Sequence, residues 1–272
     1  MKLLLITIFI IFLLLIFLME YYLYIVMKNI DTFNSDNNTN NTNTNENNIT
    51  VVSGYWKVDN KHGHSNYDEW FKNSLQINQR YIFFCEEETI SYISSFRKNL
   101  ETIYKDYPLT NFYSRKYIKD DWTDGYNVPS LDLAMIWNEK IHLIKLAKDN
   151  DTNPTEFYIW IDAGICSYRY ILPPSNKLNL KDVSSLPKNK LCYSHTDGGY
   201  HNFAATVLII HRSFIDTFHD KYYEVLENCN DGGYCGSDQF IFTKLMRSNP
   251  ELFYKISEGY GENLVTLYEK YV

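Results

Sequence analysis

The segment Phe157–Ile161 is an unbroken run of apolar residues that stops abruptly at Asp162-Ala163-Gly164. A short apolar run bounded by turn residues predicts a strand buried inside a domain. Arg80–Cys85 and Phe203–Ile210 have the same character. The sequence therefore predicts several buried strands, which need helical layers packed against them.

Amphipathic segments alternate with these runs. Ser130–Lys148 is the clearest predicted helix, with Ser130 placed to cap it. Strands alternating with helices predict an α/β fold with a mostly parallel sheet flanked by helices. The other expected helices are Tyr67–Ile77, Thr89–Phe96, Arg212–Asn228 and Asp238–Arg247, and the other expected strands are Val51–Trp56 and Pro108–Phe112.

Residues 1–28 are predicted to form a transmembrane signal-anchor. Leu3–Met19 is apolar or hydroxylated. After Glu20, a second apolar stretch, Tyr21–Met27, begins with the tyrosine-rich segment Tyr21–Tyr24, which is typical of a membrane interface. The alternative is a cleaved signal peptide, but the run is longer than such peptides use and no small-x-small cleavage site follows it. Lys2 precedes the span, which favours a single-pass type II protein whose domain is lumenal or external.

Residues 29–50 are rich in Asn and Thr and are expected to form a disordered stem, because they offer little apolar surface to bury. Asn37, Asn40 and Asn48 each begin an Asn-x-Thr sequon, which predicts a glycoprotein if the stem is lumenal; such a tract also produces sequons by chance. Residues 51–272 have the length of one globular domain.

The net charge of −7 argues against a nucleic-acid partner, since phosphate backbones select basic surfaces. The five cysteines contain no Cys-x-x-Cys pair, so no zinc site is indicated. Cys229 and Cys235 are the nearest pair and would bridge in an oxidising compartment; five free thiols are the alternative.

Asp162 is the leading candidate site residue. Ligands of open α/β sheets bind beyond the carboxyl ends of the strands, where this residue stands. Ala163 and Gly164 after it are small enough to let a ligand approach the backbone, and a carboxylate suits Mn²⁺ or Mg²⁺ bridging phosphate oxygens. A carboxylate at a strand end can also simply cap the next turn.

Three further groups of residues are candidates. Asp238 follows a glycine-rich loop and is either a catalytic carboxylate that acts on an acceptor or an ordinary helix cap. Lys140 reaches a phosphate or lies on a solvated helix face. His195 and His211 complete a metal site or are structural residues.

Several of these segments, taken in order, resemble the HtrL/YibB family. They are S-G-Y-W around Tyr55, the R-Y-I-F-F strand, the helix with I-W-N-E-K, W-I-D-A-G around Asp162, and G-S-D-Q-F around Asp238. The resemblance implies a GT-A-type glycosyltransferase domain using a nucleotide-sugar donor. Enzymes of that type hold a divalent metal with an Asp-x-Asp motif, whereas Trp160 and Gly164 occupy the positions two residues from Asp162. Either a histidine joins Asp162 at the metal, or the enzyme uses none.

Together these features predict a membrane-anchored glycosyltransferase, of hexosyltransferase type, acting on a glycan or glycoconjugate. Asp238 is the expected catalytic residue. The alternative is an inactive relative of the same fold that binds a glycan or a protein. The expected donor-binding residues are Asp162, Ala163, Gly164, Lys140 and Tyr55.

Overall fold

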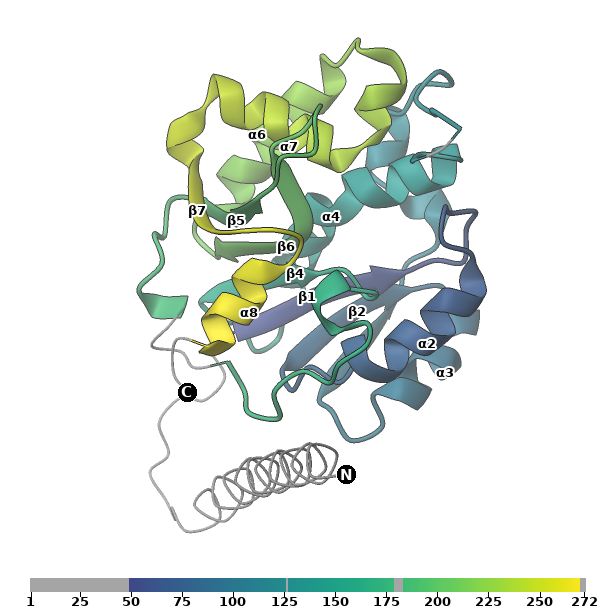
Figure 1. Ribbon diagram of the computed structural model, residues 1–272, viewed down its shortest axis with the longest axis vertical. Helices are drawn as coiled ribbons and strands as arrows, with labels where there is room; N and C mark the ends of the chain where they lie inside the picture. The colour runs from purple at the N-terminus through teal and green to yellow at the C-terminus, as the bar shows by residue number, and fades with distance from the viewer. Residues whose placement is uncertain (1–48, 126, 179–182, 270–272) are drawn as a thin grey trace, which may run out of the picture. The chain divides into compact units, whose positions relative to one another are not determined.

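The computed structural model describes residues 49–125, 127–178 and 183–269. Its centre is a seven-stranded sheet in the order β3-β2-β1-β4-β6-β5-β7 (Figure 1). Strand β6 runs antiparallel to its neighbours β4 and β5, and the other strand pairs are parallel. The predicted α/β fold with a mostly parallel sheet is confirmed. The strands are β1 (Ile49–Tyr55), β2 (Arg80–Cys85), β3 (Thr102–Asp106), β4 (Phe157–Ile161), β5 (Leu191–His195), β6 (Phe203–His211) and β7 (Phe253–Glu258).

Helices cover both faces of the sheet and so explain its apolar central strands. Every residue of β2 and of β4 is buried, as expected where helices close both sides. One face packs against α2 (His64–Ser74), α3 (Glu87–Phe96) and α8 (Glu262–Glu269). The other packs against α4 (Leu131–Asp149), α6 (Ile215–Glu227) and α7 (Asp238–Ser248).

The predicted cap of α4 is confirmed. The Ser130 hydroxyl accepts a 3.2 Å hydrogen bond from the backbone N–H of Leu133. This bond satisfies one of the amide groups left open at a helix start. It fixes where α4 begins, and α4 carries Lys140 to the site described below.

The sequence-based assignment was wrong in several places. Pro108–Phe112 contains a short 3-10 turn at Leu109–Asn111, and the strand of this region is β3, which lies earlier. Strand β3 is half-exposed at the sheet edge, so it lacks the continuous apolar signal of the inner strands. Strands β5 and β7 and helix α8 were not predicted.

The first strand begins two residues earlier than expected and takes Ile49 and Thr50 from the predicted stem. Thr50 is fully buried, and its hydroxyl accepts a 2.7 Å hydrogen bond from Arg80. The predicted anchor, the rest of the stem and the asparagines of the three sequons lie outside the described residues. Within the described ranges, no helix is long and apolar enough to cross a membrane.

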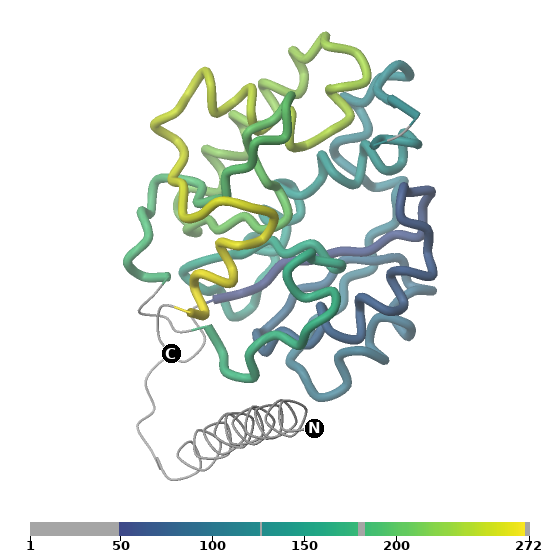
Figure 2. The backbone as a smooth tube through the Cα atoms, in the orientation of Figure 1, coloured from purple at the N-terminus to yellow at the C-terminus, as the bar shows by residue number. Residues whose placement is uncertain are grey.

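The path of the chain creates a switch point at the middle of the sheet. The chain runs outward from β1 through β2 to β3, and then returns to place β4 on the other side of β1. Figure 2 traces this path, with the purple and blue strands in one half of the sheet and the green and yellow strands in the other. Adjacent loops diverge at such a point, which leaves room for a ligand beyond the strand ends.

Candidate active site

A cavity of about 1070 Å³ opens beyond the carboxyl ends of β1 and β4. This volume is at the upper end of the range found for small-molecule sites. All six residues predicted to bind donor or act on the acceptor line it: Tyr55, Lys140, Asp162, Ala163, Gly164 and Asp238. The structure therefore brings together residues that are spread over the whole domain sequence.

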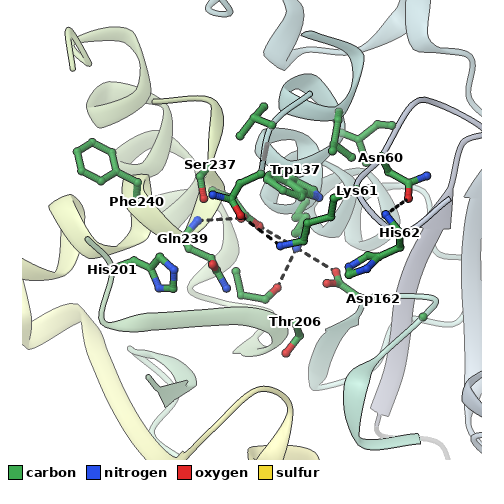
Figure 3. Close-up of a pocket in the computed structure, with 18 of the residues that line it drawn as sticks. Asn60, Lys61, His62, Trp137, Asp162, His201, Thr206, Ser237, Gln239 and Phe240 are labelled. Atoms are coloured by element: carbon green, nitrogen blue, oxygen red, sulfur yellow. Dashed lines mark hydrogen bonds and ion pairs between the residues drawn. The ribbon is translucent and has the colours of Figure 1, made fainter. Parts of the chain in front are cut away.

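Lys140 links the two predicted carboxylates. Its Nζ lies 2.9 Å from Oδ1 of Asp162 and 2.8 Å from Oδ2 of Asp238, and it donates a 3.0 Å hydrogen bond to the carbonyl of Ala205. The four residues come from α4, α7, β6 and the end of β4, and Figure 3 draws their contacts as dashed lines that meet beside Asp162. Lys140 is 4 % exposed, so the alternative prediction that it lies on a solvated helix face is wrong.

The charges within this group stabilise one another. Burial by itself lowers the pKa of Lys140, but the two carboxylates outweigh burial and raise that pKa above its ordinary value. Of the three contacts of Lys140, the one to Ala205 is a hydrogen bond, and those to Asp162 and Asp238 are ion pairs. The predicted contact of Lys140 with the donor stays a prediction.

Asp162 is the member of the group that faces the cavity, with 31 % of its side chain exposed. Its Oδ1 accepts a 2.6 Å hydrogen bond from Nε1 of Trp160 in addition to the Lys140 contact. Its backbone N–H donates to the carbonyl of Thr206 on β6. The carboxylate is thus held by two donors on one oxygen, while no described residue donates a hydrogen bond to Oδ2.

The side chain of Asp238 is more deeply buried than expected for a general base that exchanges protons with a substrate. It is 3 % exposed, and its Oδ1 accepts a 2.8 Å hydrogen bond from the backbone N–H of Gln239. Burial, together with the charge of Asp162, raises the pKa of Asp238 although Lys140 acts to lower it. Asp238 starts α7, as predicted, and its carboxylate is committed to holding Lys140.

The loop before Asp238 is fixed by a disulfide between Cys229 and Cys235, so the predicted bridge is confirmed. Gly236 in this loop packs against the backbone of Trp122, where an added Cβ would lie 2.1 Å from the carbonyl oxygen. The start of α7 is thereby tied to a distant part of the chain.

The small residues after Asp162 have a packing role as well as lining the cavity. A Cβ added at Gly164 would lie 3.1 Å from Tyr67 and 3.2 Å from Trp70, both on α2. The carbonyl of Ala163 accepts a hydrogen bond from Ser74. Glycine at this position therefore lets α2 approach the end of β4.

Two cationic side chains, Lys61 and Arg169, line the cavity. Lys61 and the neighbouring His62 are in the loop that follows β1, and both are labelled in Figure 3. Arg169 is oriented by a 2.9 Å hydrogen bond to the carbonyl of Gly164 and lies 3.7 Å above the Trp70 ring. Burial and the neighbouring charge of Arg169 lower the pKa of His62.

His195 and His211 do not join this site. His211 pairs with Phe157 at the opposite end of β4 from Asp162, and its Nε2 lies 3.6 Å from Glu156. The two ends are separated by four residues of strand, or about 13 Å. His195 faces Asp197 outside the cavity lining. Neither histidine completes a metal site with Asp162.

A divalent cation at this edge would therefore have few protein ligands. Among the described residues, the one set of three metal-binding side chains close enough to share an ion is Cys229, Asp231 and Cys235, and the disulfide engages both sulfurs. In the cavity, Oδ2 of Asp162 remains accessible. Mg²⁺ is commonly held by one or two carboxylates together with substrate phosphates. The residues fit a Mn²⁺ or Mg²⁺ ion that is coordinated largely by a bound diphosphate.

Several cavity residues were not predicted as site residues. Gln239 was quoted in G-S-D-Q-F without a role, and Trp160 was counted only as an apolar strand residue. Thr206 places in the cavity a hydroxyl that has no described hydrogen-bond partner. The spacing of Trp160 and Asp162, two residues apart, was the available signal, because such positions face the same side of a strand.

Comparison with known proteins supports the fold. No protein-family model and no curated protein sequence matches the chain, so the resemblance to the HtrL/YibB family is not confirmed. Among solved structures, the chain is similar to the Mn/GDP form of core-mannan synthase A from Aspergillus fumigatus, with a TM-score of 0.50 and 7% identity over 80% of this chain and 74% of that one.

Two further structures are similar at lower scores. Mouse xyloside xylosyltransferase 1 has a TM-score of 0.47 and 12% identity, covering 76% of this chain and 84% of that one. Galactosyltransferase LgtC with donor and acceptor sugar analogues has a TM-score of 0.44 and 11% identity, covering 76% and 72%. The likeness to core-mannan synthase A shows that the domain has a glycosyltransferase-like fold of the GT-A type.

Proposed function

We propose that this protein is a glycosyltransferase that moves a sugar from a nucleotide-sugar donor to a glycan or glycoconjugate. The observation that carries the proposal is the Asp162–Lys140–Asp238 group, built at the switch point of a GT-A-type sheet and opening on a cavity large enough for a nucleotide sugar. Fold alone does not define an activity, so the proposal rests on this site.

The donor diphosphate is proposed to lie between Asp162 and the cations that line the same cavity. Lys61 and Arg169 supply positive charge there, and His62 lies beside them. Phosphate oxygens prefer such charged donors, and Arg presents several N–H groups in one plane. When bound, a Mn²⁺ or Mg²⁺ ion would be held by Asp162 and would neutralise charge that develops on the leaving diphosphate.

Asp238 was predicted to orient or deprotonate the acceptor hydroxyl. Its enclosure favours a positioning role in which it holds Lys140, which in turn holds Asp162. Gln239, next in the chain, lines the cavity and provides the amide that we propose contacts the acceptor. The alternative is that Asp238 accepts the proton of the acceptor hydroxyl. A pH–rate profile of Asp238→Asn separates the two roles, because loss of a general base removes the fall in rate on the acidic side of the profile.

The nearest alternative is an inactive protein of the same fold. It is favoured by Trp160, which stands where Asp-x-Asp would place a second carboxylate. The membrane anchor, the type II orientation and the HtrL/YibB relationship belong to the proposal as well. They rest on the sequence pattern of residues 1–28 and on the ordered motifs.

The test is a thermal-shift screen of UDP- and GDP-sugars with and without Mn²⁺. A bound donor should raise the melting temperature of the wild type by mass action. Asp162→Asn should lose this response, whereas Asp216→Asn, on the surface of α6, should keep it. The proposal fails if no nucleotide sugar shifts the wild type. Donor binding without any nucleotide release above that of Asp162→Asn would identify the inactive alternative.

A further inference from the structure

Exposed aromatic rings gather at one end of the cavity. Tyr200 is 63 % exposed and Tyr234 is 45 % exposed, and both line the same cavity as Asp238. Their ring centroids are 4.5 Å apart, and Phe240 lies 5.6 Å from Tyr234 on the other side. The three rings come from the loop between β5 and β6, from the loop before α7, and from the first turn of α7.

The loops that carry these rings are held in place. Asn202, next to the Tyr200 loop, donates its backbone N–H to Thr243 and accepts a hydrogen bond from Arg247, both on α7. The Tyr234 loop is closed by the disulfide described above, and Gly233 packs against the carbonyl of Thr123. The rings are thus exposed although their backbones are anchored. Apolar surface kept exposed in this way commonly marks a binding site.

This end of the cavity differs from the donor end in charge. Asn60 and His62 lie on one side of the buried Lys140 group, whereas Phe240 and His201 lie on the other (Figure 3). Arg169 belongs to the first side, whereas burial and the charge of Lys61 lower the pKa of both His62 and His201. At the aromatic end, Asp231 and Lys244 form an ion pair and compensate each other, and Lys244 Nζ lies 5.6 Å from the Phe240 ring centroid. This end therefore offers a ligand mainly aromatic surface.

We infer that Tyr200, Tyr234 and Phe240 form the acceptor subsite, and that the acceptor is an uncharged oligosaccharide whose terminal pyranose ring stacks on them. The C–H face of a pyranose is apolar and packs on the negative face of an aromatic ring. Gln239, next to Phe240 in the chain, lines the cavity, and its amide can bond sugar hydroxyls. The inference rests on the proposed function, because it places the acceptor next to the proposed donor site.

The experiment uses an array of neutral and anionic glycans probed with the full chain in the presence of UDP, GDP and Mn²⁺. The wild type should bind one or more neutral glycans. The double variant Tyr200→Ala/Tyr234→Ala should bind them about tenfold more weakly or worse, as expected for lost aromatic stacking. Tyr254→Ala is the matched control, since Tyr254 is 46 % exposed on β7 and does not line the cavity; it should bind like the wild type.

Donor binding is measured on the same samples by thermal shift, which keeps the two proposals separate. A double variant that retains both the nucleotide response and full glycan binding overturns the acceptor subsite and leaves the proposed function standing. The acceptor subsite is also overturned if the wild type binds only anionic glycans or binds no glycan. A wild type that responds to no nucleotide contradicts the proposed function itself.

Discussion

The indole Nε1 of Trp160 donates a 2.6 Å hydrogen bond to Oδ1 of Asp162. The two residues are two positions apart at the end of β4, so their side chains face the same side. An Asp-x-Asp motif would place a second carboxylate at the earlier position. This chain places a hydrogen-bond donor there, and Lys140 adds a positive charge to the same oxygen. The orientation of Asp162 is therefore set by the protein before any ligand binds.

Trp160→Phe tests this orientation. The variant keeps a buried aromatic ring but removes a hydrogen bond to a charged group, which is worth roughly 1.5–3 kcal/mol. We expect the nucleotide sugar found in the screen to bind about tenfold more weakly or worse, measured by calorimetry.

Trp122→Phe is the matched control for that experiment. Trp122 is fully buried, and its Nε1 has no hydrogen-bond partner among the described residues. It should lose stability through the smaller ring without a change in nucleotide affinity. Equal affinities in the two variants would show that the Trp160 bond has no influence on the donor site.

Lys140→Met should destabilise the fold strongly. The change leaves Asp162 and Asp238 facing each other without a compensating charge, and breaking a buried ion pair costs roughly 3–5 kcal/mol. Lys145→Met on the same helix removes ion pairs with Asp149 and Asp216 at the surface, where such pairs contribute about 0–1 kcal/mol. Urea unfolding of both variants measures the difference. Similar losses of stability in Lys140→Met and Lys145→Met would mean that the charges of Asp162 and Asp238 are solvated.

Mn²⁺ should bind only together with a nucleotide diphosphate. One accessible carboxylate oxygen is too few for a protein-built site, and phosphate oxygens would supply the remaining ligands. Calorimetric titration of the metal-free protein with Mn²⁺ should show no binding near micromolar concentrations, whereas the same titration with UDP or GDP present should. Tight binding of Mn²⁺ alone would point to ligands beyond Asp162.

Reduction of the Cys229–Cys235 bond should lower stability by about 2 kcal/mol, the loop-closure value for a short loop. Thermal unfolding with and without reductant measures this change. The double variant Cys229→Ser/Cys235→Ser should start at the lower stability and show no response to reductant. Cys166→Ser, which removes an exposed free thiol, should behave like the wild type. A reductant effect that persists in the double variant would exclude this disulfide as its source.

The protein should lose stability in mild acid through His142. Its Nδ1 lies 3.1 Å from Nε2 of His219, and burial, followed by the charges of His219 and Lys145, lowers the pKa of His142 to about 4. The unfolded chain, with a pKa near 6.5, binds more protons than the folded protein between these values. Stability should therefore fall by about 1–2 kcal/mol as the pH drops from 6.5 to 4, allowing for partial exposure.

His142→Gln should flatten this part of the stability–pH curve, as followed by urea unfolding at several pH values. His195→Gln is the control, because His195 lies beside Asp197 on another part of the surface; its curve should keep the wild-type slope. A slope that is unchanged in His142→Gln would assign the acid sensitivity to other groups.

Much of the fold could be predicted from the sequence. Strands β2 and β4 were predicted to the residue, because strands covered on both faces are continuously apolar. The edge strands β3 and β7 are half-exposed, so their composition did not distinguish them from loops. Strand β5 is largely buried, and it was missed because it ends in the polar residues Ser194 and His195 and so lacks a continuous apolar run.

The sequence by itself determined which chemical groups this protein can use. Asp162 after an apolar strand and Asp238 after a glycine-rich loop were identified from local pattern, since turn residues and hydrophobic periodicity are properties of short segments. Only the tertiary structure decided that Lys140 joins them, that Trp160 orients Asp162, and that His211 lies at the far end of the sheet. Those relationships depend on strand order and helix placement, which bring together residues nearly a hundred positions apart. The physical reason is that a buried charge is tolerated only where its partners converge, and that convergence is a property of the folded chain.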